Sequence, residues 1–300
     1  MADSGSIRAV FYALGANAAI AVAKYVAAFI TGSHSMVAEA VHSTADCGNQ
    51  LLLLFGLRRS KRPPSGEYPM GFGKEQYFWS FVVALLLFSV GGLFSVYEGW
   101  QKLGETEGMS SPFVAIGVLA FAIVAEGFSM WGAMREIGKV RRGRSLWQWF
   151  RGTRSAELVV IFGEDFAALV GLVLALAAVV ASWLTGNPVY DAAGSIAIGV
   201  LLIVVAAMVA VEVKALLVGQ GVEPTVRRDM LAFLEQQAPV SRVIELLTLH
   251  MGEDVMVAIK AEMRDCPSTR ALVDEINGVE TAFRKRFPQA QWVFFEPDVR

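Results

Sequence analysis

Residues 34–50 read HSMVAEAVHSTADCGNQ and place the ionisable side chains of Glu39, His42 and Asp46 in a largely apolar segment. These three residues are spaced i, i+3 and i+7, so they share one face of a helix. The apolar run LLLLF at 51–55 follows directly, which indicates that this polar face lies at membrane depth. Ionisable groups at that depth are costly and usually functional, so the stretch predicts a site inside a membrane protein.

The composition also indicates a polytopic membrane protein. Of the 300 residues, 55% are hydrophobic and only 18% are charged, and the mean hydropathy is +0.49. The formal net charge of -2 gives no basic signal, so we expect no nucleic-acid partner. The two cysteines, Cys47 and Cys266, cannot form a disulfide framework and lie far from any histidine cluster that would make a thiolate zinc site.

Six segments are close to, or longer than, the roughly 20 apolar residues that cross a bilayer. They are predicted at residues 7–31, 35–57, 76–100, 113–134, 157–184 and 192–217. Lys24 lies inside the first span, where we favour snorkelling or pairing with an intramembrane carboxylate over a role in transport. The sequence therefore predicts a transmembrane domain of six helices at residues 1–217.

The connections between spans differ in charge, which predicts the orientation. The second-to-third connection carries five basic residues and the fourth-to-fifth carries seven, whereas the opposite connections carry only Lys102. Basic connections normally stay in the cytoplasm, so both termini are predicted to be cytoplasmic. No transit-peptide pattern precedes the first span, and we therefore expect a bacterial inner membrane.

The composition after residue 217 is that of a water-exposed domain, predicted at 218–300. A helix is predicted at 224–238, strands at 243–251 and 255–263, a helix capped by Ser268 and ending near Phe287, and a strand at 292–295. The order αββαβ is typical of a two-layer domain of ferredoxin-like type. The fold class predicted for the whole chain is thus a helical membrane bundle followed by a small α+β domain.

The candidate metal ligands are the acids and the imidazole at membrane depth. Besides the residues of the second span, these are Glu126 on the fourth span and Glu164 with Asp165 on the fifth. Packing of the second span on the fifth would gather one imidazole and several carboxylates, a mixed set of ligands that favours Zn²⁺ over Mg²⁺ or Ca²⁺ without excluding Mn²⁺, Co²⁺ or Fe²⁺. The alternative is that these groups only form hydrogen bonds between helices.

The candidates differ in the roles predicted for them. His42 and Asp46, one turn apart, are the best-defined pair, and Asp165 is their partner on the fifth span. Glu164 is a weaker candidate ligand, because consecutive helical residues point about 100° apart. Glu39 is predicted to be a relay, exit residue or ligand, and Glu126 a helix-helix or proton-linked group.

Four stretches resemble the cation diffusion facilitator transporters, especially the branch with the animal mitochondrial zinc exporter. They are HSMVAEAVHSTADCGNQ (34–50), YPMGFGKEQYFWSF (68–81), GEDFAALVG (163–171) and NPVYDAAGSIAIGVLL (187–202). The resemblance covers essentially the whole chain. It implies a homodimer that exports Zn²⁺ or a related divalent ion from the cytoplasm in exchange for protons, by alternating access.

The resemblance also assigns residues. The family's His-x-x-x-Asp on the second span falls on His42 and Asp46, and the Asp on the fifth span falls on Asp165. Most zinc-transporting members have His at the position of Ile161, so we expect a site of three side chains completed by Glu164 or water. Protons compete with metal for such ligands, and His42 is predicted to contribute to proton coupling.

The tail lacks the metal ligands that many relatives carry. The matching region holds Lys260, Phe294 and Glu296, and its one histidine, His250, is predicted to be an ordinary surface or hydrogen-bonded residue. The tail is therefore interpreted as a dimerisation module.

Two other classes of function, an enzyme and a scaffold, are alternatives to metal transport. An intramembrane metalloprotease needs a motif such as H-E-x-x-H, and the sequence has only His34, His42 and His250, so we expect no enzyme and no prosthetic group. A membrane scaffold without transport activity would use the intramembrane charges for packing alone, and metal uptake into vesicles would distinguish it from a transporter.

Overall fold

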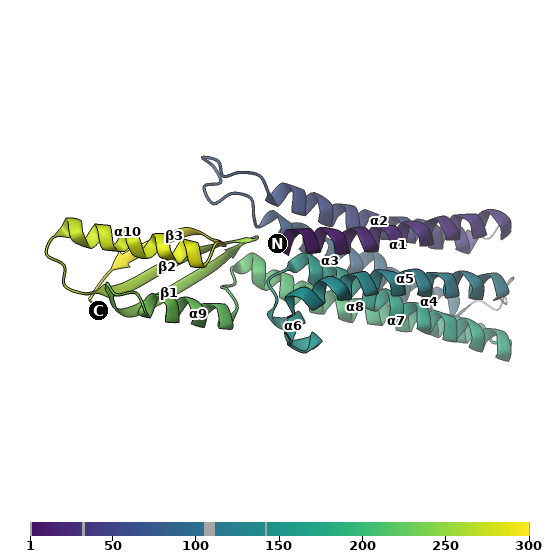
Figure 1. Cartoon of the computed structure of the whole chain (residues 1–300). Coiled ribbons are helices and arrows are strands. Elements are labelled where there is room, and N and C mark those ends of the chain that lie inside the picture. The colour runs from purple at the N-terminus through teal and green to yellow at the C-terminus, as the bar shows by residue number, and fades with distance from the viewer. Residues whose placement is uncertain (1, 32–33, 105–111, 142, 300) are drawn as a thin grey trace. The chain divides into compact units, whose positions relative to one another are not determined.

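The computed structural model describes residues 2–31, 34–104, 112–141 and 143–299 (Figure 1). The chain forms two compact units. The first consists of Met1–Arg58, Gln76–Arg151 and Ser155–Lys214, and the second of Arg59–Glu75, Gly152–Arg154 and Ala215–Arg300. Each unit is described separately below.

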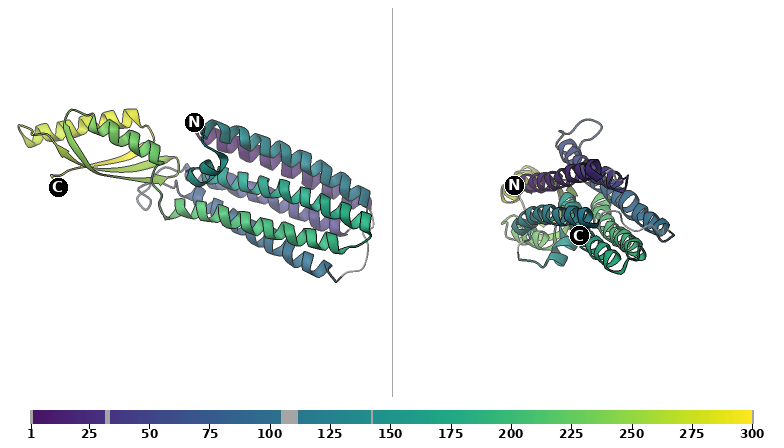
Figure 2. Two further views of the ribbon diagram at one scale, coloured as in Figure 1. Left: turned by 90° about the horizontal axis from the view of Figure 1, so that it is seen from below. Right: turned by 90° about the vertical axis from the view of Figure 1, so that its right-hand side faces the viewer.

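Long helices that run side by side form the first unit (Figure 2). They are α1 (Ala2–Thr31), α2 (His34–Ser60), α3 (Glu75–Leu86) continued by the π-helix η1 (Leu87–Leu93) and α4 (Phe94–Lys102), α5 (Pro112–Val140), α7 (Ala156–Thr185) and α8 (Val189–Val218). Among the described residues, five segments are long and apolar enough to cross a membrane. They correspond to five of the six predicted spans. The sixth is α2, which carries the polar stretch 34–50, and its crossing stays a prediction.

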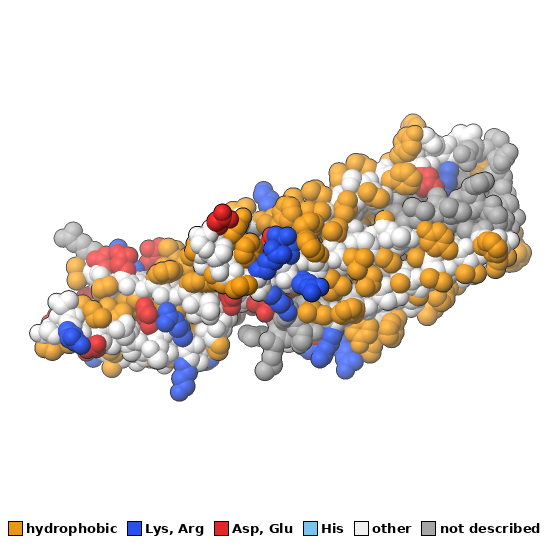
Figure 3. Space-filling view, turned by 90° about the horizontal axis from the view of Figure 1, so that it is seen from above, with side chains coloured by type: hydrophobic (Ala, Val, Ile, Leu, Met, Phe, Trp, Pro, Cys, Tyr) orange, Lys and Arg blue, Asp and Glu red, His pale blue; other side chains and the backbone are white. Residues whose placement is uncertain are grey.

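Large apolar side chains cover the outside of these helices. Phe29 is 92% exposed, and Val124 and Leu184 are each 72% exposed. On the face seen in Figure 3, hydrophobic side chains extend along the helical bundle. Most of the Lys and Arg side chains that this view shows on the bundle itself lie towards one of its two ends. Apolar surface of this extent is stable in lipid rather than in water, so the chain is a multi-pass membrane protein.

The third predicted span is not a uniform α-helix, because η1 interrupts it between α3 and α4. A π-helix shifts the backbone pairing by one residue. Ser89 lies within η1, and its Oγ donates to Leu85 O at 2.8 Å; Ser95 lies at the start of α4, and its Oγ donates to Gly91 O at 2.6 Å. Serine hydroxyls that bond to the carbonyl of the preceding turn in this way often bend a helix.

Glycines allow this span to approach α8 closely. A Cβ placed on Gly99 would lie 2.8 Å from Ile196 N and 2.9 Å from Ala192 O, and one on Gly199 would lie 2.8 Å from Gly92 O. Small residues at such contacts are the usual way in which membrane helices pack closely.

The short helix α6 (Leu146–Gly152) was not predicted. Its residues Trp149 and Phe150 are buried, with ring centroids 5.9 Å and 6.1 Å from that of Phe162 on α7. Helix α6 is therefore held by aromatic packing, which seven residues of sequence do not reveal.

The C-terminal elements have the predicted αββαβ order. They are α9 (Pro224–Glu235), β1 (Val240–Met251), β2 (Asp254–Met263), α10 (Thr269–Arg286) and β3 (Ala290–Pro297). The sheet order is β1-β2-β3, with β1 and β2 antiparallel and β2 and β3 parallel. Gly252, with φ +86°, forms the tight turn between β1 and β2. The ferredoxin-like assignment stays a prediction.

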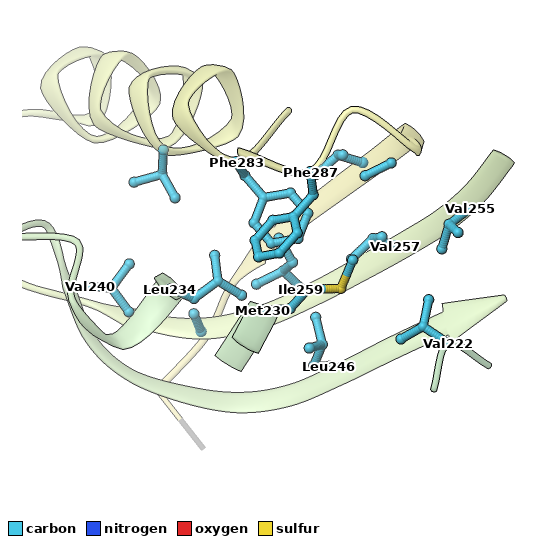
Figure 4. Close-up of a cluster of buried hydrophobic side chains, with 14 residues drawn as sticks. Val222, Met230, Leu234, Val240, Leu246, Val255, Val257, Ile259, Phe283 and Phe287 are labelled. Carbon is cyan, nitrogen blue, oxygen red and sulfur yellow. The ribbon is translucent and has the colours of Figure 1, made fainter. Parts of the chain in front are cut away.

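One hydrophobic core stabilises this sheet and its two helices (Figure 4). Alternate residues of β2, including Val257 and Ile259, point into it and meet Met230 of α9 and Phe283 of α10. The Ser268 side chain accepts a hydrogen bond from Ala271 N at 3.2 Å, which confirms it as the N-cap of α10.

Candidate metal centre

Asp165 lies on α7 and is only 1% exposed. Its carboxylate oxygen Oδ2 accepts a hydrogen bond of 2.8 Å from Ser129 Oγ on α5, and this bond is buried. A carboxylate can accept more than one bond, so the remaining lone pairs of Asp165 are still suited to a cation. Ser129 therefore orients a candidate ligand from a neighbouring helix.

Glu164, the preceding residue, contacts a different helix. Its Oε2 accepts a bond of 2.6 Å from Gln50 Nε2, and its Oε1 accepts one of 3.3 Å from Asn49 Nδ2. Both amides belong to α2, so buried hydrogen bonds join the second predicted span to the fifth. The two adjacent acids thus point to different neighbours, as expected for residues about 100° apart on a helix.

On α2, Asp46 is half-buried and lies one turn before Gln50. Asp46 interacts electrostatically with Glu164 of α7 and with Glu126 of α5. The side chains of Glu39 and His42 lie outside the described residues, although the backbone of both belongs to α2. The helical i, i+3, i+7 relation of the opening stretch is therefore present in the backbone of α2.

Glu126 is buried on α5 and completes a group of acids. It interacts electrostatically with Asp165 and Asp46, and also with Lys24 of α1. We call Asp46, Glu126, Glu164 and Asp165 the acidic cluster; its members come from α2, α5 and α7. Within the described part of the chain, no three His, Cys, Asp or Glu side chains converge closely enough to bind one ion.

Three residues around the acidic cluster were not predicted to belong to the site: Asn49, Gln50 and Ser129. Asn49 and Gln50 end the quoted stretch 34–50, and Ser129 lies one turn after Glu126. Buried amides and hydroxyls are common in membrane bundles, so sequence spacing alone does not indicate which carboxylate they contact. Ile161, which stands where the family resemblance led us to expect His, is completely buried.

In the C-terminal unit, Lys260 occupies one of the positions for which the family resemblance implied a comparison with metal ligands. Its Nζ lies 2.6 Å from Asp298 Oδ2 and 3.6 Å from Glu296 Oε1. His250 is partly buried, with Nδ1 at 3.4 Å from Gly252 O. Burial lowers the pKa of His250, with a further contribution from the positive charge of Arg154.

Comparison with known proteins identifies the family. The model of the cation efflux transmembrane domain matches residues 10–218. The chain belongs to the cation diffusion facilitator family. The predicted resemblance is thereby confirmed. This chain, called the facilitator below, is a member of a family of transporters of metal cations.

Several relatives match most of this facilitator. Metal tolerance protein C4 of Arabidopsis thaliana is 32% identical over 245 residues, which cover 81% of the chain and 54% of that protein. The mitochondrial proton-coupled zinc antiporter of Xenopus laevis is 34% identical over 242 residues, covering 80% and 43%. The human protein of the same name is 31% identical over 242 residues, covering 80% and 42%. The facilitator thus spans about half the length of these curated relatives.

The prediction of a bacterial inner membrane is wrong. The animal relatives and a yeast metal transporter are named as mitochondrial, and another relative belongs to a plant. The prediction depended on the few residues that precede the first span, and these residues do not identify a membrane.

Proposed function

We propose that this facilitator exports a divalent metal ion, with Zn²⁺ as the favoured substrate, in exchange for protons and by alternating access. The acidic cluster carries this proposal, because it brings the half-buried Asp46 of α2 within electrostatic range of buried carboxylates of α5 and α7. Two relatives named proton-coupled zinc antiporters support the choice of ion and of countertransport. Mn²⁺, Co²⁺ and Fe²⁺ are the alternative substrates.

The proposed site lies between α2 and α7, with His42, Asp46 and Asp165 as ligands. Glu164 is the candidate for the fourth position, and water is the alternative. Each oxygen of Glu164 already accepts one amide hydrogen bond, so coordination would use a remaining lone pair while Asn49 and Gln50 hold the carboxylate towards α2. Glu39 and Glu126 are assigned to proton relay or to support of the ligands.

Protons supply the means of release, since they bind the same carboxylates and imidazole as the metal. Metal binding displaces protons, and protonation from the opposite side of the membrane displaces the metal. We also propose that residues 218–300 join two copies of the chain into a homodimer.

Uptake by proteoliposomes tests the function. Intact protein is expected to accumulate Zn²⁺ in proteoliposomes with an acidic interior, where the outward proton gradient drives uptake. Parallel assays with Mn²⁺, Co²⁺ and Fe²⁺ establish which metal the protein prefers. Asp46→Ala and Asp165→Ala should abolish uptake. Asp191→Ala is the matched control, because Asp191 lies at the start of α8 beside Lys102, at 3.7 Å, and outside the acidic cluster. Equal uptake by all variants would refute the site, and no uptake by intact protein would favour a scaffold.

A further inference from the structure

Lys24 is the one Lys, Arg or His among the buried side chains of the described residues. It is 7% exposed, and its Nζ donates a hydrogen bond of 2.9 Å to Ser43 Oγ on α2. The next residues also meet, with Thr44 Oγ1 at 3.3 Å from Tyr25 Oη. These contacts place the ammonium group beside the turn of α2 that contains candidate ligands.

The surroundings of Lys24 are acidic. Helix α1 packs along α5 (Figure 2), and Glu126 of α5 interacts electrostatically with Lys24, Asp46 and Asp165. Glu164 interacts in turn with Glu126, Asp46 and Asp165. The ammonium group of Lys24 therefore lies within reach of the group of acids proposed to bind the metal.

A positive charge is costly to bury unless negative groups compensate it. A tether between α1 and α2 needs only a neutral donor, such as an amide or a hydroxyl. The position of Lys24 therefore favours a function that depends on its charge. A transport site must bind its ion strongly enough to capture it and weakly enough to release it.

We propose that Lys24 is a built-in cation that weakens metal binding at the acidic cluster. Without metal, its charge compensates the carboxylates and limits the number of protons needed to neutralise them. With metal, the two positive charges repel each other, and this repulsion promotes release. The proposal rests on the proposed function and adds Lys24 as a residue that sets affinity without binding the ion.

Zn²⁺ titration of the full chain in lipid nanodiscs tests the proposal, together with uptake by proteoliposomes. Lys24→Met and Lys24→Gln remove the charge and should bind Zn²⁺ about tenfold more tightly or better, because a unit charge and a divalent ion still interact appreciably at a separation of about 10 Å in a protein interior. Their rates of uptake should fall. Lys24→Arg, which keeps the charge, should stay within about threefold of intact protein in affinity.

Two controls separate charge from structure. Ser43→Ala removes the hydrogen bond and keeps the charge, so its Zn²⁺ affinity should be unchanged. Asn17→Leu removes another buried polar group two turns earlier on α1, and it should alter thermal stability without tightening Zn²⁺ binding. Unchanged or weaker binding by folded Lys24→Met and Lys24→Gln would overturn the proposal. If Asp165→Asn also binds Zn²⁺ normally, the proposed function fails as well.

Discussion

Removal of the Ser129 hydroxyl is predicted to weaken metal binding without removing a ligand. In Ser129→Ala, Asp165 loses the donor that lies 2.8 Å from its Oδ2, in a part of the bundle where both side chains are almost completely buried. No water replaces that donor easily, so the carboxylate becomes free to rotate away from the ion. The variant keeps all of the proposed ligands.

The expected size of the effect follows from the bond that is lost. A hydrogen bond to a charged group contributes about 1.5–3 kcal/mol, and each 1.36 kcal/mol corresponds to a factor of about ten. Residues that orient metal ligands typically change affinity by about 10- to 100-fold when mutated. We therefore expect the Zn²⁺ dissociation constant of Ser129→Ala to rise by about 10- to 100-fold.

Isothermal titration in nanodiscs measures this change, and uptake at several Zn²⁺ concentrations should show a higher KM. Ser95→Ala is the control, because it also removes a serine hydroxyl donor, which there bonds to Gly91 O at 2.6 Å, away from the acidic cluster. A dissociation constant for Ser129→Ala within threefold of the intact protein, when Asp165→Asn abolishes binding, would refute the role of Ser129.

Three further predictions concern stability. Gly99→Ala should destabilise the bundle by about 1–3 kcal/mol, since its Cβ would meet backbone atoms of α8 at 2.8 and 2.9 Å. Thermal unfolding measures this, with Gly117→Ala as the control, because nothing lies within 4 Å of a Cβ at that position; an equal loss of stability in both variants would contradict the packing argument. Ser268→Ala should lower the free energy of unfolding of the tail by about 1 kcal/mol, because α10 loses its N-cap, and amide hydrogen exchange in α10 should become faster. Unchanged exchange rates would show that the cap does not stabilise α10. Because the pKa of His250 is lowered in the folded tail, the unfolded tail binds a proton more readily, so the contribution of His250 to stability is full above about pH 6.5 and falls as the pH is lowered. His250→Gln should flatten this pH dependence of the free energy of unfolding. An identical pH profile for the variant and the intact protein would exclude His250 as its source.

The parts of the fold that depend on long-range composition were predictable from the sequence. Continuous apolar runs indicated the long helices, and strict alternation in β2 indicated which of its residues enter the core. Helix α6 and the π-helix η1 were missed for a physical reason. Both depend on contacts with other segments, such as the packing of Trp149 on Phe162, and seven residues carry too little periodicity to indicate them.

The candidate site was predictable in its residue types more than in its arrangement. Acids in apolar helices stand out in any sequence, and Asp46, Glu164 and Asp165 were identified in this way. Their hydrogen-bond partners were not, because the choice between Ser129 and the α2 amides depends on how three helices rotate about their axes. Spacing along one helix fixes which residues share a face, but it does not fix which neighbour that face meets.

The π-helix η1 gives the third span a mechanical property that a continuous α-helix lacks. Wider turns are more easily bent and rotated, and bends in long helices concentrate at such segments. The segment before it, Glu75–Leu86, can therefore turn about the helix axis by a different amount from Phe94–Lys102, because close packing on α8 at Gly92, near the end of η1, and at Gly99 restrains the later part of the span. The span then consists of two stiff segments joined by a compliant one. Spectroscopic labels placed on its two ends would report two different motions during a transport cycle.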